Sequence, residues 1–236
     1  MGSVNGVSVG VVIPAAGKGV RMGGTRKQFR TLDSKPVLYW TVRLFDRHDE
    51  IDHIVIAAPE GDIEYVKGAL EREGIETAYS VIPGGATRQQ SVSKGIQALP
   101  AEVNVVLIHD AVRPFVYKHM ISEVISSICK EGAAALAIPV ADTLRSVGDD
   151  QFQQTVPREG VYRMQTPQGA MKDALEDAFN AAEKNNWQVT DDVDILNRAG
   201  YTVKVVEGSS LNIKITTRAD WDFACLIWPT WVSNNT

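Results

Sequence analysis

Cysteine and histidine are scarce in this sequence, and their scarcity limits the chemistry that it can support. The 236 residues include only two cysteines and four histidines, and these show no spacing typical of a metal site. Cys129 and Cys225 both fall in apparent helices among apolar neighbours. We therefore expect buried free thiols at these two positions and no structural disulfide.

Long apolar runs and an excess of basic residues are also missing. No run reaches the length of a membrane span, and the start MGSVNG lacks the cationic region and apolar core of a signal peptide. We therefore expect a cytoplasmic protein without a membrane partner. The 24 Lys and Arg residues against 29 Asp and Glu leave a net charge of −5, which argues against broad binding of nucleic acid.

Acidic residues are absent from the first 32 positions, although they outnumber the basic ones in the whole chain. That stretch holds five cations, so the rest of the chain carries 19 cations against 29 acids. The five are Lys18, Arg21, Arg26, Lys27 and Arg30. A local excess of cations in an acidic protein indicates a site for a small, strongly anionic ligand.

These cations follow a strand-like segment within residues 7–30, VSVGVVIPAAGKGVRMGGTRKQFR. Its run of Val, Ile and Gly is too continuous to leave one face in water, so we expect a buried strand that ends at Pro14. The four glycines between positions 17 and 24 then let the backbone turn tightly and bring N–H groups close to an anion. A strand followed by a glycine-rich loop is the context of phosphate loops, and we prefer that interpretation to a flexible, solubilising loop.

The loop differs from two common nucleotide-binding motifs. It lacks the Gly-Lys-Ser/Thr ending of a Walker A loop. Gly17 and Gly19 could begin a dinucleotide fingerprint, but Met22 occupies the place of its third glycine. The second expected strand ends in Ala57, Ala58 and Pro59, where the fingerprint would have an acid, so an NAD-dependent oxidoreductase is disfavoured.

Strand-like and helix-like segments alternate along most of the chain. Expected strands after the first lie at 53–59, 79–82, 103–108, 133–139 and 201–206. Expected helices lie at 36–45, 62–73, 88–99, 117–131, 171–186, 191–199 and 218–228, and Pro229 should end the last one. This alternation predicts an α/β fold, doubly wound around a mostly parallel sheet, in a single domain of residues 1–236.

The alternation breaks over residues 142–168, where two β-like runs flank a turn at 148–150. This pattern predicts a projecting β-hairpin arm over about residues 143–164. The segment lacks the apolar residues for a core of its own, and an isolated hairpin is marginal in water. Two arrangements stay open on composition alone: an arm that packs on a second subunit, and a hairpin folded back on its own domain.

Two segments at expected strand ends carry further polar groups. Residues 84–91 form a second glycine-rich turn that opens a helix, and Ser91 and Arg88 could bind a ligand there. A plain loop-to-helix cap is the alternative. Asp110 follows an expected central strand, at the edge where ligands bind in open α/β sheets. Near a triphosphate this carboxylate suits Mg²⁺, although it could simply pair with Arg113.

Four other side chains are ambiguous when taken alone. Thr143 and Arg158 lie at the base and the return of the hairpin. Thr190 precedes an expected helix and could cap it as well as contact a ligand. Lys214 lies in an extended apolar segment, where a surface lysine is the ordinary interpretation.

Together, the motifs occur in an order typical of one family across nearly the whole chain. They are PAAGxGxRM followed by KQF, then GGxTRxxSV, HDAVRP, PVxDT, TPQ, TDD and NIKIT. In these segments the chain resembles the sugar-phosphate nucleotidyltransferases, and most of all the cytidylyltransferases that act on 2-C-methyl-D-erythritol 4-phosphate. Relatives that act on ribitol 5-phosphate share HDAVRPF and NIKITT, so that acceptor is the alternative. Leu211 stands where the family often has an acid, which leaves Asp110 as the clearer metal candidate.

The resemblance implies transfer of CMP from CTP to a polyol phosphate in the synthesis of isoprenoid precursors, with Mg²⁺ at Asp110. A homodimer would form through the arm, and a non-catalytic CTP-binding subunit is the remote alternative. The implied catalytic residues are Arg21, Lys27 and Lys214. The implied nucleotide contacts are Pro14, Ala15, Ala16, Gly17, Gly19, Gly84, Gly85, Arg88, Ser91, Asp110 and Ala111. The implied acceptor contacts are Arg113, Thr143, Arg158 and Thr190, of which Thr143 and Arg158 would come from the partner's arm.

Overall fold

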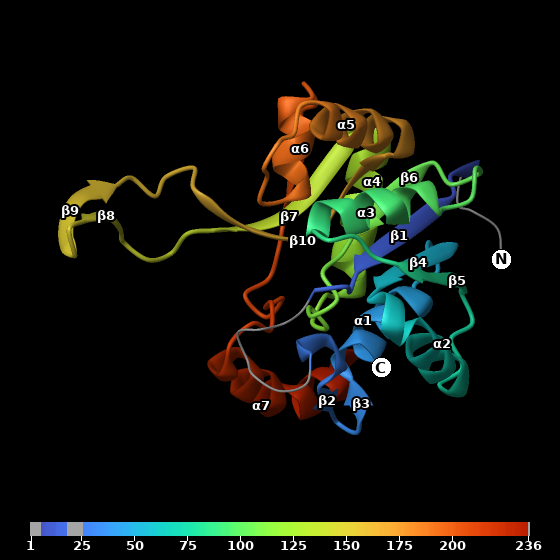
Figure 1. Ribbon diagram of the computed structural model, residues 1–236. Helices are drawn as coiled ribbons and strands as arrows, with labels where there is room; N and C mark the ends of the chain where they lie inside the picture. The colour runs from blue at the N-terminus through green and yellow to red at the C-terminus, as the bar shows by residue number, and fades with distance from the viewer. Residues whose placement is uncertain (1–5, 18–25, 236) are drawn as a thin grey trace.

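A seven-stranded sheet forms the centre of the computed structural model, which describes residues 6–17 and 26–235 (Figure 1). Its strands are β1 (Val9–Pro14), β4 (His53–Ala58), β5 (Ala78–Pro83), β6 (Val105–Ile108), β7 (Ala133–Pro139), β10 (Tyr162–Met171) and β11 (Lys204–Glu207). They lie in the order β11-β7-β10-β6-β1-β4-β5. Neighbouring strands are parallel except that β10 runs antiparallel to both β6 and β7. The predicted α/β fold with a mostly parallel sheet is therefore confirmed.

Helices cover both faces of this sheet, which explains why β1 reads as a continuous apolar run. The helices are α1 (Val37–Asp46), α2 (Ile63–Arg72), α3 (Arg88–Gln97), α4 (Lys118–Glu131), α5 (Lys172–Lys184), α6 (Asp192–Arg198) and α7 (Arg218–Asn235). Val11 and Ile13 share a buried cluster with α1, α2 and α4, whereas Val12 faces α3, α5 and α6. A Cβ at Gly95 of α3 would lie 2.3 Å from Cγ1 of Val12, so this glycine lets α3 sit directly on β1.

Strand β10 was not expected from the sequence. Its first residues, 162–164, were expected to belong to the returning strand of the hairpin arm. The structure inserts β10 between β6 and β7, so residues 162–164 of the expected arm pair with β7 instead. Positions 165–170 are all buried, yet they include Gln165, Thr166 and Gln168. A central strand that carries three polar side chains does not show the apolar run by which buried strands are recognised.

The predicted hairpin is present as β8 (Leu144–Gly148) paired with β9 (Gln151–Val156). Its turn residues, Asp149 and Asp150, have φ values of 50° and 58°, the left-handed pair that two-residue hairpin turns use. The hairpin stands away from the sheet at the end of two extended connections (Figure 1). It does not fold back on its own domain, which removes one of the two arrangements that composition left open.

Helix α7 continues through Pro229, so the prediction that the helix ends there was wrong. A proline inside a helix removes one hydrogen bond and costs about 3 kcal/mol. Trp228 and Trp231 are both 6% exposed and pack on Phe115, with ring centroids 5.9 and 5.4 Å away. Burying two large aromatic side chains outweighs the lost hydrogen bond, because each removes on the order of 150–250 Å² from water.

Short segments complete the described chain: β2 (Thr31–Leu32), β3 (Lys35–Pro36) and the 3-10 turns η3 (Lys27–Phe29) and η4 (Glu60–Asp62). Cys129 and Cys225 are free, as expected, but both are exposed, so the expectation of buried thiols was wrong. Within the described residues, no helix combines the length and apolar character that crossing a membrane demands.

Candidate active site

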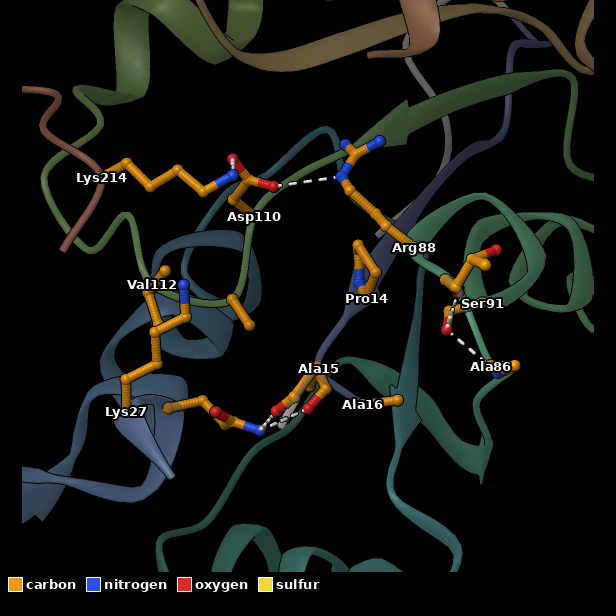
Figure 2. A pocket seen from close by; sticks show the side chains of 15 residues that line it. Pro14, Ala15, Ala16, Lys27, Ala86, Arg88, Ser91, Asp110, Val112 and Lys214 are labelled. Carbon is orange, nitrogen blue, oxygen red and sulfur yellow. Dashed lines mark hydrogen bonds and ion pairs between the residues drawn. The ribbon is translucent and has the colours of Figure 1, made fainter. Parts of the chain in front are cut away.

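A pocket of about 440 Å³ opens where β1 and β6 end and α3 begins (Figure 2). Residues expected from the sequence line most of it: Pro14, Ala15, Ala16, Gly17, Lys27, Gly85, Arg88, Ser91, Asp110, Ala111 and Lys214. Four further residues line it: Gln28, Val112, and Ala86 and Thr87 of the 84–91 segment. Arg21 and Gly19 lie outside the described residues. The pocket therefore gathers four segments that are far apart in the sequence at one edge of the sheet.

The first loop is held by a buried glutamine. Gln28 is 2% exposed and donates from Nε2 to the carbonyl oxygens of Ala15 (2.6 Å) and Gly17 (3.1 Å). These bonds tie the end of the loop to its beginning and place Lys27, the neighbouring residue, on the pocket wall. Gln28 belongs to the KQF motif, which was the one sequence signal that could have marked it.

The second loop packs tightly on the first. A Cβ at Gly84 would lie 2.3 Å from Cβ of Ala16, so only glycine permits this approach. The hydroxyl of Ser91 accepts from the Gly85 N–H (3.0 Å) and donates to the Thr87 carbonyl (2.9 Å). Thr87 in turn caps α3. Ser91 thus orders the loop in this structure, in addition to lining the pocket.

Asp110 is surrounded by three cations: Arg88 at the start of α3, Arg113 of its own loop, and Lys214 of the 212–214 segment. Its Oδ1 lies 3.3 Å from Nε of Arg88, and its Oδ2 lies 2.9 Å from Nζ of Lys214 and 3.3 Å from Nε of Arg113. Figure 2 shows Lys214 and Arg88 meeting Asp110 from opposite sides of the pocket. Burial alone would raise the pKa of Asp110, but the charges of Arg88, Lys214 and Arg113 hold it well below its usual value. The carboxylate is therefore ionised at neutral pH.

Arg88 is fixed by a second buried carboxylate that sequence reasoning missed. Asp192 is fully buried and accepts from Nη1 (2.9 Å) and Nη2 (2.7 Å) of Arg88. Burial opposes the charged guanidinium, yet Asp192 and then Asp110 raise the pKa of Arg88 above its usual value. Oε1 of Gln168 accepts from the Asp192 N–H (3.0 Å), so β10 positions this acid. The Thr-Asp-Asp motif contained Asp192 but did not distinguish which acid was structural.

Arg113 lies behind Asp110 and is not among the pocket-lining residues. It is 8% exposed and donates to the carbonyl of Asn212 (2.7 Å), two residues before Lys214. Burial lowers the pKa of Arg113, and Asp110 partly offsets this effect. The structure therefore places Arg113 where it supports Asp110 and the 212–214 segment, and the acceptor contact that the resemblance implied stays a prediction.

His109 stands beside this cluster and is fully buried. Thr166 Oγ1 lies 3.1 Å from its Nδ1, and its Nε2 lies 3.0 Å from the Arg113 carbonyl. Burial lowers the pKa of His109 to about 4, so the ring is neutral at pH 7. Because Thr166 Oγ1 also accepts from the Asp110 N–H (3.1 Å), the histidine anchors the backbone of the central acid to β10.

The three other expected acceptor contacts do not line this pocket. Thr143 and Arg158 are exposed at the base of the arm, where Arg158 donates to the Ala141 carbonyl. Thr190 is also exposed, and Asp191, not Thr190, caps α6 by accepting from the Asp194 N–H (2.9 Å). One chain therefore presents the expected nucleotide contacts together, while the expected acceptor contacts lie apart from them.

Asp110 is the one carboxylate among the residues that the structure describes along this pocket. The described part of the chain contains no group of three or more His, Cys, Asp or Glu that could hold a metal. Mg²⁺ is commonly bound by one or two carboxylates together with substrate phosphates, and Asp110 fits that arrangement. A metal held by protein ligands alone does not fit the side chains present.

Glycine-rich loops, convergent cations and a single acid at the ends of parallel strands are suited to a polyphosphate and to charge that moves between phosphate groups. Fold and site together define an α/β nucleotidyltransferase. The model of the IspD family, 2-C-methyl-D-erythritol 4-phosphate cytidylyltransferase, matches residues 9–228, and the chain belongs to this family.

Known proteins match this chain over almost the full length of both sequences. The chain is 46% identical over 221 residues to the 2-C-methyl-D-erythritol 4-phosphate cytidylyltransferase of Salinibacter ruber, covering 94% of this chain and 93% of that one. It is 39% identical over 215 residues to that of Alkaliphilus metalliredigens, covering 90% and 89%. Among solved structures, 4-diphosphocytidyl-2C-methyl-D-erythritol synthase from Anaerococcus prevotii superposes with a TM-score of 0.84 at 31% identity, covering 95% and 97%.

Proposed function

We propose that the pocket transfers CMP from CTP to 2-C-methyl-D-erythritol 4-phosphate and releases pyrophosphate. One observation supports this assignment above the others. Arg88 and Lys214 converge from separate elements on Asp110, directly beside two glycine-rich loops, in a chain that belongs to the cytidylyltransferase family. The cluster offers positive charge on the side where a triphosphate would lie and a fixed acid beside it.

In this reaction an oxygen of the acceptor phosphate attacks the α-phosphorus of CTP. The bond from that phosphorus to the bridging oxygen breaks, and pyrophosphate leaves with the electron pair. A phosphate dianion is already nucleophilic, so no general base is needed, and catalysis depends on alignment and on neutralising charge. We assign that work to Lys27 and Lys214, together with Arg21 in the part of the loop outside the described residues.

Lys214 has a second property that suits this role. Its Nζ lies 2.9 Å from Oδ2 of Asp110, and its side chain is 37% exposed. Because the side chain already reaches solvent, it can turn from the carboxylate to phosphate oxygens without a rearrangement of the core. Asp110 would hold Mg²⁺ together with the nucleotide phosphates, and that ion would neutralise part of the triphosphate charge. Arg88 and Asp192 keep Asp110 in place, and we assign Arg113 the same supporting role.

We assign cytosine and ribose to the space between the two loops, residues 15–19 and 84–91. Acceptor binding is assigned to Thr190 of the same chain and to Thr143 and Arg158 from the arm of a second copy. The arm exposes Val147 (60%), Phe152 (81%) and Val156 (40%), apolar side chains that a second copy would cover. The proposed active unit is therefore a homodimer in which each arm completes the neighbouring site.

The test is a pyrophosphate-release assay that combines CTP, UTP, ATP and GTP with methylerythritol phosphate and ribitol 5-phosphate. We expect release with CTP and methylerythritol phosphate, and at least tenfold slower release with every other pair. Preference for ribitol 5-phosphate would keep the cytidylyl transfer but change the acceptor. CTP binding without release for either acceptor would instead indicate a non-catalytic subunit.

A further inference from the structure

A second pocket, of about 380 Å³, lies between α1, α4 and α7 and shares no lining residue with the first. Aromatic side chains form much of its wall: Trp40, Tyr117, Trp228 and Trp231. The ring centroids of Trp40 and Trp228 are 4.6 Å apart, as are those of Tyr117 and Trp231. This volume lies in the range of small-molecule sites, which are mostly apolar with a few polar groups. We call it the aromatic pocket.

Two of the tryptophans turn their polar atoms away from this space. Nε1 of Trp40 donates to the Leu32 carbonyl (2.7 Å), and Nε1 of Trp228 donates to Oδ2 of Asp33 (3.0 Å). Their hydrogen-bonding capacity is therefore satisfied within the protein. The ring faces that remain offer an apolar surface to a ligand, which requires no hydrogen bond from the indoles.

Cations line the same pocket without an acid among them. Its described lining includes Arg43, Arg47 and Lys118, but no Asp or Glu. Arg43 is paired with Asp46, whereas Arg47 and Lys118 are exposed and form no ion pair with any described residue. The protein as a whole carries a net charge of −5, so the charge of this pocket is opposite in sign to that of the protein.

We propose that the aromatic pocket binds a small apolar anion: a molecule with an aromatic or hydrocarbon body and one phosphate, sulfonate or carboxylate group. The body would lie against Trp40, Trp228 and Trp231, and the anionic group would lie toward Arg47 and Lys118. An uncharged hydrocarbon would leave the two cations unmatched, and a bare phosphate would leave the aromatic wall in contact with water. Both parts of the ligand are therefore needed for binding.

The test uses the fluorescent dye 8-anilinonaphthalene-1-sulfonate, an aromatic sulfonate of this class. Three of the five tryptophans line the pocket, so we expect saturable energy transfer from tryptophan to bound dye. Decyl phosphate, kept below its micelle concentration, should displace the dye. Decanol and inorganic phosphate at the same concentration should not, and neither should excess CTP. Equal displacement by decanol, or displacement by CTP, would overturn the proposal.

Variants then locate the dye. The double variant Arg47→Ala/Lys118→Ala should bind it at least fivefold more weakly, since each exposed charge contact contributes modestly. Lys130→Ala is the matched control, because Lys130 is exposed on the same helix as Lys118 but does not line the pocket. Unchanged affinity in a folded double variant would refute the anion site. Loss of dye binding in Phe152→Ala would show that the dye lies on the arm.

Discussion

The sheet and the arm are both built from β-strands, but they are stabilised in opposite ways. Strand β6, Val105–Ile108, is buried along its whole length, whereas every residue of β9, Gln151–Val156, is exposed. The sheet is enclosed by helices on both faces, while the hairpin has only the pairing between its own two strands. An isolated hairpin is marginal in water, so we expect the arm to be less stable than the sheet unless another surface packs on it.

This contrast divides the proposed function between two parts of the molecule. The body assembles the nucleotide pocket from its own strand ends, and it can do so in a single chain. The arm carries Thr143 and Arg158 at its base, away from that pocket. If the arm completes a neighbouring site, nucleotide binding belongs to one chain, and the reaction requires two.

Removal of divalent metal should have the largest effect, and it acts on the body alone. EDTA should abolish pyrophosphate release and added Mg²⁺ should restore it, because Asp110 is the one described carboxylate at the pocket. Asp110→Asn should raise the Mg²⁺ concentration needed for half-maximal rate. Full activity in EDTA would exclude the metal, whereas an unchanged Mg²⁺ dependence of the variant would exclude only Asp110.

Replacing one lysine of the pocket should have the second-largest effect on activity. Lys27→Ala and Lys214→Ala should each lower kcat by about a hundredfold or more, the usual effect of removing one preorganised charge contact. The fold should persist, since both side chains lie on the pocket wall. Lys130→Ala, distant from the pocket, is the control and should keep the parental rate. A folded Lys27→Ala protein with near-normal turnover would remove Lys27 from the mechanism.

Mixing two inactive variants tests whether the arm serves the neighbouring chain. Lys27→Ala damages the body, and Arg158→Ala damages the arm. In a mixed dimer one site lacks both groups and the other has both, so random exchange should restore about a quarter of the parental activity. Subunit exchange must be verified independently, for example by native mass spectrometry. Exchange without recovery would mean that Arg158 acts in its own chain or not at all.

A substitution in the core should change the free energy of unfolding much more than a substitution in the arm. Ile121→Ala removes a fully buried side chain of α4 and should lower the free energy of unfolding by about 2–5 kcal/mol. Phe152→Ala removes a side chain that is 81% exposed and should change it by about 0.5 kcal/mol or less. Urea denaturation should be measured at concentrations where the protein is monomeric. A large loss in Phe152→Ala there would place the arm on its own body.

Lowering the pH should reduce the free energy of unfolding, because His109 is buried in its neutral form. The folded pKa is about 4 and the unfolded value is 6.5, so the unfolded chain binds more protons between these limits. Stability is therefore complete above pH 6.5 and falls as the pH drops toward 4, by roughly 1–2 kcal/mol at pH 5. His109→Gln should flatten this part of the profile, whereas His119→Gln, at an exposed position, should not. An equal slope in both variants would contradict the assignment.

The features that could be predicted from the sequence are those that a short run of neighbouring residues decides. The apolar run of β1 matches a strand that is buried on both faces, and Gly84 of the second glycine-rich turn marks the place where that loop approaches Ala16 closely. The turn at Asp149 and Asp150 was equally visible, because its backbone requirement is local. Such features depend on a few neighbouring residues and can be read from them.

Other parts were missed because distant partners decide them. Gln165, Thr166 and Gln168 are acceptable in a central strand because Asn212, His109 and Asp192 satisfy them. Asp192 became a site residue only through Arg88, far away in sequence. Pro229 is tolerated in α7 because tertiary packing of its aromatic neighbours outweighs a local penalty. Propensity describes each residue alone, whereas these outcomes depend on pairs.

The position of β10 has a consequence for the newly made chain. β6 and β7 are synthesised before β10, yet each bonds to β10 and not to the other. Until residues 162–171 have left the ribosome, β6 and β7 therefore each present an unpaired edge. Open strand edges are where chains associate wrongly, and pairings that are distant in sequence form slowly. The nascent protein passes through a stage in which the strand that will join β6 to β7 has not yet been made, and chaperone binding should be concentrated at that stage.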